Sequence, residues 1–127
     1  MKTEHEIVLS SLRHTWILDL DGTIVKHNGY KIDGTDSFLP NAKEFLDSLP
    51  KDDVLIFMTS RTENEKHLTE TFLKNNQINY DHILYNIPYG ERILINDQKP
   101  SGLCTAIAIS GERNNFEERK IRIDSNL

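Results

Sequence analysis

Short apolar runs of strand length alternate along this chain with segments that have helical spacing, and this alternation constrains the fold more than any other feature. Residues 54–58 form a continuous apolar run, and residues 15–20 form a run rich in apolar and β-branched side chains. Continuous apolar runs are typical of parallel strands that are buried on both faces. Because strands that alternate with helices specify a parallel sheet covered on both sides, we expect an α/β fold with three α/β/α layers.

Two segments have the spacing of amphipathic helices. In residues 40–49, apolar side chains recur every three or four positions; a proline opens the segment and another follows it. Residues 62–75 have helical composition with apolar side chains on one face. Thr62 and Glu65 have the spacing of a capping box, which predicts that this helix begins there.

Three further strands and an N-terminal segment complete the expected order of elements. Residues 81–86, 92–97 and 105–109 are of strand length and partly or wholly apolar, and we expect each to form a strand. Residues 6–12 are expected to be a short helix or an irregular lead-in. In parallel sheets ligands bind beyond the carboxyl ends of the strands, so the polar residues that follow these runs are candidates for a site.

A flap over about residues 24–38 is expected after the first strand. The stretch 26–37 contains Asn28-Gly29 and Asp33-Gly34, two turn signals close together. Such a pair of turns is typical of a small hairpin or flap.

Length and composition limit the class of protein. A chain of 127 residues is long enough for a core of its own, so we expect one domain over residues 1–127 with its core at about 15–110. No apolar run approaches the roughly 18 residues that span a bilayer, and no secretory signal is visible, so we expect no membrane partner and a cytoplasmic location.

The net charge of -5 argues against nucleic acid as a partner. The single cysteine, Cys104, is expected to be a small core residue.

The segment Asp19-Leu20-Asp21-Gly22-Thr23 places two carboxylates at the end of the first expected strand. Because side chains alternate along a strand, Asp19 and Asp21 can face one pocket while Leu20 points into the core. The repulsion between two carboxylates is relieved by a hard cation such as Mg²⁺. Asp19 can then attack phosphorus and form an aspartyl-phosphate, while Asp21 serves as acid and base. Gly22 permits an unusual backbone turn beside the phosphate site.

Polar groups that follow later strands complement this pair. Thr59 and Ser60 come directly after residues 54–58 and offer a hydroxyl and backbone amides to a transferring phosphoryl group. Asp97 ends the expected strand 92–97 and is the natural third ligand of Mg²⁺. The phosphoryl oxygens also need a cationic side chain, and spacing does not rank the candidates firmly. They are, with the first choice first, Lys99, Arg92, Arg61 and Lys66.

These residues resemble the haloacid dehalogenase superfamily, in which a first strand ends in D-x-D-G-T, a second in Thr or Ser, and a later one in acidic metal ligands. The resemblance covers about residues 15–110 and is most specific at residues 18–24, with a good match at residues 57–61. It implies a Rossmann-like fold. It also implies that Asp19 is the nucleophile, Asp21 the acid/base and Thr59 a phosphate ligand, and that Mg²⁺ is held by Asp19, the Asp21 carbonyl and Asp97.

The sequence departs from the family pattern in two places. The last family motif often carries two acidic residues, whereas residues 95–99 contain one, so Asn96 or water would complete the coordination. The family lysine shortly before that strand has no clear match, because Arg92 occupies the region. The aspartate at position 21 favours the phosphatases of the family over its dehalogenases, which lack it, and over its ATPases, which carry threonine.

The family usually obtains its specificity from an inserted cap domain, and neither gap between the motifs has room for one. The chain therefore resembles a capless member. Such members act on large or polymeric substrates, or close their sites by forming homo-oligomers. Residues 93–100, with residues 105–109 beyond them, also look like small phosphatases associated with bacterial surface-polysaccharide synthesis.

Three hypotheses of function follow. The leading one is a Mg²⁺-dependent phosphomonoesterase acting on a sugar phosphate or similar small phosphorylated metabolite, in polysaccharide or capsule biosynthesis. The second is a phosphatase of nucleic-acid ends or phosphoproteins, which a capless site would permit and the acidic charge disfavours. The third is a non-catalytic phospho-acceptor or sugar-nucleotide-binding module that uses the two carboxylates for metal alone. Asp21 discriminates among these hypotheses, because only the phosphatases need it as an acid and base.

Overall fold

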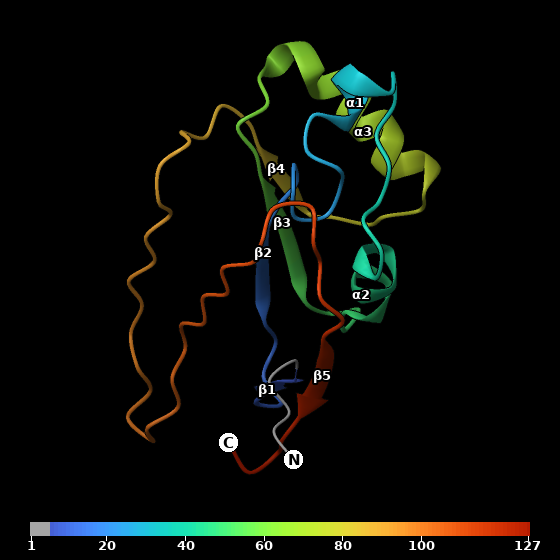
Figure 1. The fold of residues 1–127 in the computed structure, drawn as a ribbon. Helices are drawn as coiled ribbons and strands as arrows, with labels where there is room; N and C mark the ends of the chain where they lie inside the picture. The colour runs from blue at the N-terminus through green and yellow to red at the C-terminus, as the bar shows by residue number, and fades with distance from the viewer. Residues whose placement is uncertain (1–5) are drawn as a thin grey trace.

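A three-stranded parallel sheet stands at the centre of the molecule (Figure 1). The structure is a computed structural model and describes residues 6–127. The strands are β2 (Thr15–Asp19), β3 (Val54–Met58) and β4 (His82–Leu84), and β3 lies between the other two. Asp19 pairs with Met58, so β2 and β3 end at the same edge of the sheet. The expected α/β class and the first three strands of the main sheet are confirmed.

The helices cover one face of this sheet. Helices α1 (Gly29–Ile32), α2 (Ala42–Ser48) and α3 (Lys66–Asn75) all lie to one side of the strands in Figure 1. A short 3-10 helix, η1 (Glu63–Glu65), leads into α3. The side chain of Thr62 accepts a hydrogen bond from a backbone N–H of the first turn and that of Glu65 accepts one from the Thr62 N–H, so the predicted capping box is confirmed.

The core lies between the sheet and the helices. Along β3, Leu55 and Phe57 are buried, whereas the other residues of the strand are only half-buried. On β2, Trp16 and Leu18 pack against the core, and Ile17 on the opposite face is exposed. The remaining buried members of the core cluster are Leu20, Ile24, Val25, Leu39, Ala42, Leu46, Leu73 and Ile78.

The expectation of three layers is therefore wrong for this part of the chain. Among residues 6–127 the structure places no helix against the face that carries Ile17, and that side chain is 48% exposed. The apolar run of β3 suggested cover on both faces, but the burial alternates along the strand with a period of two. Such alternation is the pattern of a sheet with one covered face.

A second, two-stranded sheet joins the two ends of the described chain. Strands β1 (Glu6–Leu9) and β5 (Lys120–Ile123) run parallel, with Ile7 paired to Ile121. The expectation of a helix or irregular lead-in over residues 6–12 is corrected, because β5 supplies a hydrogen-bonding partner from more than 100 residues away. Such a distant partner leaves no local signal in the sequence.

A long segment without regular structure follows β4. Residues 86–119, all of which the structure describes, contain no helix or strand, so the strands expected at 92–97 and 105–109 are corrected. Figure 1 shows residues 86–112, which we call the arm, running away from the sheet and returning. Ile93 is 84% exposed and Ile95 is 91% exposed. An extended segment with no neighbouring strand cannot complete a hydrogen-bonded ladder.

Two smaller expectations are also settled by the structure. Cys104 was expected in the core, but it lies on the arm and is exposed. The flap contains the short helix α1 instead of a hairpin, although the Lys26 N–H donates to the Ser37 carbonyl and closes the base of the loop. Within residues 6–127, no helix has the length and apolar character needed to cross a membrane.

Candidate functional site

The two carboxylates follow one another at the carboxyl end of β2. Asp19 is the last residue of the strand, and Leu20, which is 1% exposed, turns inward between Asp19 and Asp21. The predicted alternation is confirmed. The backbone then closes a tight turn in which the N–H groups of Thr23 and Ile24 both donate to the Leu20 carbonyl, at 3.1 and 2.9 Å. Gly22 within this turn has a φ of +82°, a conformation that favours glycine.

Asp19 is the accessible carboxylate of the pair. Its side chain is 35% exposed, and the Thr23 hydroxyl donates to its Oδ2 atom at 3.1 Å. Arg92, from the start of the arm, donates from Nη1 to the Oδ1 atom at 3.2 Å. The structure therefore brings one of the predicted cations, Arg92, directly to the predicted nucleophile.

Asp21 is held by Arg61, which follows β3. Arg61 donates from Nε to Asp21 Oδ2 and from Nη2 to Asp21 Oδ1, both at 2.9 Å. The same guanidinium contacts Asp36 of the flap. Burial lowers the pKa of Arg61, but the hydrogen bonds and charges of the two aspartates outweigh burial and raise that pKa above its ordinary value. Arg61 is therefore a permanent cation between two carboxylates.

Thr59 and Ser60 lie where β3 ends, as expected. Thr59 is 1% exposed, and its Oγ1 atom accepts a hydrogen bond from the Arg61 backbone N–H at 3.0 Å. Its backbone N–H donates to the Leu84 carbonyl of the neighbouring strand. Thr59 is thus fixed by its surroundings, and Ser60 beside it is half-buried.

Residues near the C-terminus also reach this site. The Asn114 N–H donates to the Gly22 carbonyl at 2.8 Å, and its Oδ1 atom accepts from the His27 N–H at 2.7 Å. A Cβ atom at Gly22 would lie 3.1 Å from Cγ of Arg113, so the aliphatic part of Arg113 covers this turn. Sequence reasoning missed these contacts, and the one available signal was the tolerance of asparagine for the left-handed conformation that Asn114 adopts, with a φ of 62°.

Three predicted site residues lie elsewhere. Asp97 and Lys99 are on the arm, where the Asp97 N–H donates to the Asn96 side chain and the Lys99 N–H donates to the Leu103 carbonyl. Lys66 begins α3 and faces a different hollow. In residues 6–127 there is no group of three or more histidine, cysteine or acidic side chains that could hold a metal ion.

Part of the expected magnesium site fits the residues present. Mg²⁺ binds oxygen ligands, commonly takes one or two carboxylates from the protein and keeps several waters. The partly exposed carboxylate of Asp19 and the main-chain carbonyl of Asp21 suit that pattern. The Asp21 carboxylate is engaged by Arg61, and Asp97 is on the arm. Of the three expected ligands, Asp97 is therefore the one that the structure places away from the other two.

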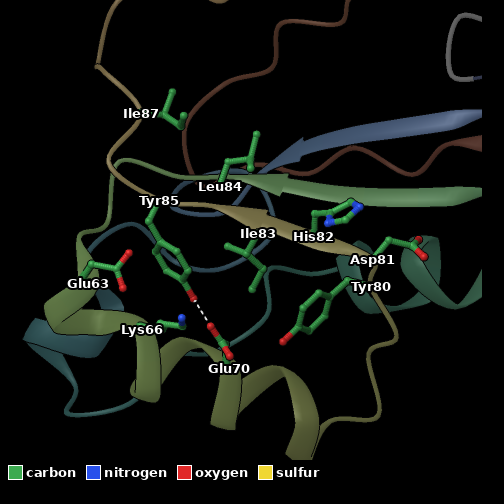
Figure 2. Close-up of a pocket in the computed structure, with 10 residues that line it drawn as sticks. All are labelled: Glu63, Lys66, Glu70, Tyr80, Asp81, His82, Ile83, Leu84, Tyr85 and Ile87. Atoms are coloured by element: carbon green, nitrogen blue, oxygen red, sulfur yellow. Dashed lines mark hydrogen bonds between the residues drawn. The ribbon is translucent and has the colours of Figure 1, made fainter.

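A separate hollow of about 540 Å³ lies between α3 and β4 (Figure 2). The Tyr85 hydroxyl donates to Glu70 Oε2 at 2.9 Å across it, and burial together with this acidic partner raises the pKa of Tyr85. Its other lining residues are Glu63, Lys66, Tyr80, Asp81, His82, Ile83, Leu84 and Ile87. None of the predicted carboxylates lines this hollow, so it is distinct from the site at the end of β2.

The chain was also compared with known proteins. Searches against models of protein families, against curated proteins and against solved structures each returned no match.

Proposed function

We propose that the chain is a Mg²⁺-dependent phosphomonoesterase, a capless member of the haloacid dehalogenase superfamily with a Rossmann-like core. One observation carries the proposal. Asp19 and Asp21 stand on either side of a buried Leu20 at the carboxyl end of a parallel strand, next to Thr59 at the end of the neighbouring strand. In open α/β sheets this is the edge at which ligands bind.

The reaction proceeds in two displacements at phosphorus. In the first, a carboxylate oxygen of Asp19 forms a bond to phosphorus while the bond to the leaving oxygen breaks, and Asp21 gives that oxygen a proton. In the second, Asp21 takes a proton from water, the water oxygen bonds to phosphorus, and the bond between phosphorus and Asp19 breaks. Inorganic phosphate leaves, and both aspartates return to their starting states.

Two other groups support these steps. Arg92 already contacts Asp19, so its guanidinium is the best placed of the predicted cations to meet the phosphoryl oxygens. The Asp19 carboxylate and the Asp21 carbonyl would hold Mg²⁺, which supplies positive charge against the phosphate when it is bound. Because Arg92 contacts Asp19, it takes the role for which Lys99 was the first choice.

The proposed substrate is a small phosphorylated metabolite, in particular a sugar phosphate of polysaccharide or capsule biosynthesis. The partial exposure of Asp19 supports an open, capless site. The sugar class rests on the likeness of residues 93–100 and 105–109 to small phosphatases of surface-polysaccharide synthesis. A panel of sugar, polyol and nucleotide phosphates would identify the substrate by comparing kcat/KM.

Substitution of the acid/base tests the mechanism most directly. Asp21→Asn should lower kcat for p-nitrophenyl phosphate by about 100-fold or more, because the amide cannot transfer the proton. Asp47→Asn is the matched control, since Asp47 is an exposed carboxylate that pairs with Lys43 on α2. Turnover should vanish on chelation with EDTA and return with Mg²⁺. Undiminished turnover in Asp21→Asn would show that Asp21 is not the acid and base of the reaction.

A second candidate function has an observation in its favour. Both oxygens of Asp21 already accept hydrogen bonds from Arg61, which also suits a non-catalytic module in which Asp21 only shapes the turn. Such a module would bind metal and phosphate without turnover. Trapping of an aspartyl-phosphate that disappears in Asp19→Asn would exclude a purely binding role, whereas phosphate binding with no hydrolysis of any ester would favour it.

A further inference from the structure

The sequence placed Arg61 among the residues that could bind the substrate phosphate, and its surroundings argue for another role. We infer that Arg61 is a positioning residue, which orients the carboxylate of Asp21 and fastens the flap to the site. The inference rests on the proposed function, because it concerns the side chain that holds the acid/base. The evidence is that every N–H donor of the buried Arg61 guanidinium is already hydrogen-bonded within the protein.

Every N–H donor of Arg61 has a partner inside the protein. Nε and Nη2 donate to the two oxygens of Asp21 at 2.9 Å each. Nη1 and Nη2 donate to the two oxygens of Asp36 at 2.9 and 2.8 Å. The second N–H of Nη1 donates to the Thr69 hydroxyl at 2.9 Å. A guanidinium has five such donors, so a phosphate could bind Arg61 only after one of these bonds had broken.

Burial and charge also separate Arg61 from the substrate. The side chains of Arg61 and Asp36 are each 2% exposed, so this pair is shielded from water and from any ligand in solution. The positive charge of Arg61 is already shared between two aspartate side chains, so little of it is left to attract a phosphate. Paired bidentate contacts to carboxylates are the geometry for which arginine is suited.

The partners of Arg61 come from three separate parts of the chain. Asp21 follows β2, Thr69 lies on α3, and the flap provides both Asp36 and Tyr30. The guanidinium lies 4.5 Å from the centre of the Tyr30 ring, in a cation–π contact. Arg61 therefore fixes the direction of the Asp21 carboxylate and holds the flap with two different contacts.

The inference can be tested on the flap side of the cluster, where Asp21 and Arg61 stay intact. Asp36→Asn removes one charge and one acceptor from Arg61. We expect kcat for p-nitrophenyl phosphate to fall about 10- to 100-fold, because a small displacement of a catalytic group has an effect of that size, while KM changes less than about twofold. Amide hydrogen exchange in residues 26–38 should rise at the same time.

The matched control is Asp33→Asn, a change of the same kind on the same flap. Asp33 is exposed and pairs with Lys26 at 3.0 Å, outside the cluster. Asp33→Asn should leave kcat and hydrogen exchange in the flap almost unchanged, because an exposed ion pair contributes little to stability. Thr69→Val is a gentler second variant, which removes one acceptor of Arg61 and keeps both ion pairs. It should lower kcat less than Asp36→Asn does and leave KM unchanged. If Asp36→Asn does not fold, a fall in kcat at constant KM in Thr69→Val is the result that the inference requires.

Two results would overturn the inference. A rise in KM with unchanged kcat, in Asp36→Asn or Thr69→Val, would mean that Arg61 binds the phosphate. Equal kcat and equal hydrogen exchange in Asp36→Asn and Asp33→Asn would mean that the contacts of Arg61 hold neither Asp21 nor the flap in place. If the wild-type protein hydrolyses no phosphate ester, the proposed function fails, and hydrogen exchange still decides the link between Arg61 and the flap. Raised exchange in Asp36→Asn alone would support that link, and unchanged exchange would refute it.

Discussion

Residues 54–58 and residues 92–97 each contain a run of apolar side chains suited to a strand, and they have opposite surroundings in the structure. The first segment is β3, which pairs with β2 on one side and β4 on the other and buries Phe57 completely. The second lies on the arm, where Ile93, Leu94 and Ile95 are all exposed. A strand needs partners for its backbone as well as suitable side chains, and these two segments differ in partners.

The same contrast divides the candidate site. Asp21 is fixed from the packed side by Arg61, which is buried and fully hydrogen-bonded. Asp19 is met from the arm by Arg92, whose side chain is 33% exposed and makes a single contact of 3.2 Å with it. One side of the site is thus built into the core, and the other depends on a segment that makes few contacts with the core.

The largest expected effect on stability comes from removing a buried side chain of the core. Phe57→Ala should lower the free energy of unfolding by about 3–5 kcal/mol, because it removes a buried ring and leaves a cavity. Ile17→Ala on the open face of β2 is the control, and its effect should be about 1 kcal/mol or less. Urea unfolding at equilibrium measures both changes. Equal losses would show that a further layer covers Ile17 in solution.

A smaller effect on stability is expected at Asp53, which links the start of β3 to the start of β2. Asp53 precedes β3 and accepts hydrogen bonds from the Trp16 Nε1–H at 2.9 Å and from the His14 N–H at 3.0 Å. Burial raises the pKa of Asp53, but these hydrogen bonds, together with the contact and charge of the His14 ring at 2.7 Å, outweigh burial and hold the pKa below its ordinary value. The ionised carboxylate is therefore favoured in the folded state over the unfolded state.

The sign of the resulting pH dependence follows from that lowered pKa. The contribution of Asp53 is fully present above its unfolded pKa, near 4, and is lost as the pH falls through the lower folded value. Asp53→Asn should lower stability at neutral pH by about 1–3 kcal/mol, because donors in the folded protein lose their charged acceptor. The difference from the wild type should shrink below pH 4. A constant difference from pH 7 to pH 2.5 would contradict the assignment.

The comparison also shows what could be predicted from sequence. The runs that became β2 and β3, the helix over residues 40–49 and the capping box at Thr62 depend on neighbours within a few residues or on strong apolar patterns, and all are present. The pairing of β1 with β5 and the contacts of Asn114 with Gly22 join residues about 90 or more positions apart. Periodicity carries no information about such partners.

The site followed the same rule. The positions of Asp19, Asp21 and Thr59 could be predicted because each follows a strand whose own pattern is strong. The roles of the cations could not, because they depend on tertiary distances: Arg61 reaches Asp21 across 40 residues and Arg92 reaches Asp19 across 73. Lys99 has a suitable spacing from Asp97, but both lie on the arm. Spacing alone therefore did not identify which of the candidate cations lies beside each carboxylate.

The smallest expected effect tests the arm itself. Replacing Ile93 and Ile95 together by threonine keeps β-branched side chains and removes much of their apolar surface, so the change reports burial and little else. With both side chains exposed, the free energy of unfolding should change by no more than about 0.5 kcal/mol, as measured by urea titration. A loss of about 2 kcal/mol or more would mean that these side chains are buried in solution. The segment would then be the strand that its sequence predicts, and β2, an edge strand of the main sheet in the described part of the chain, is where such a strand could bring Asp97 toward Asp19.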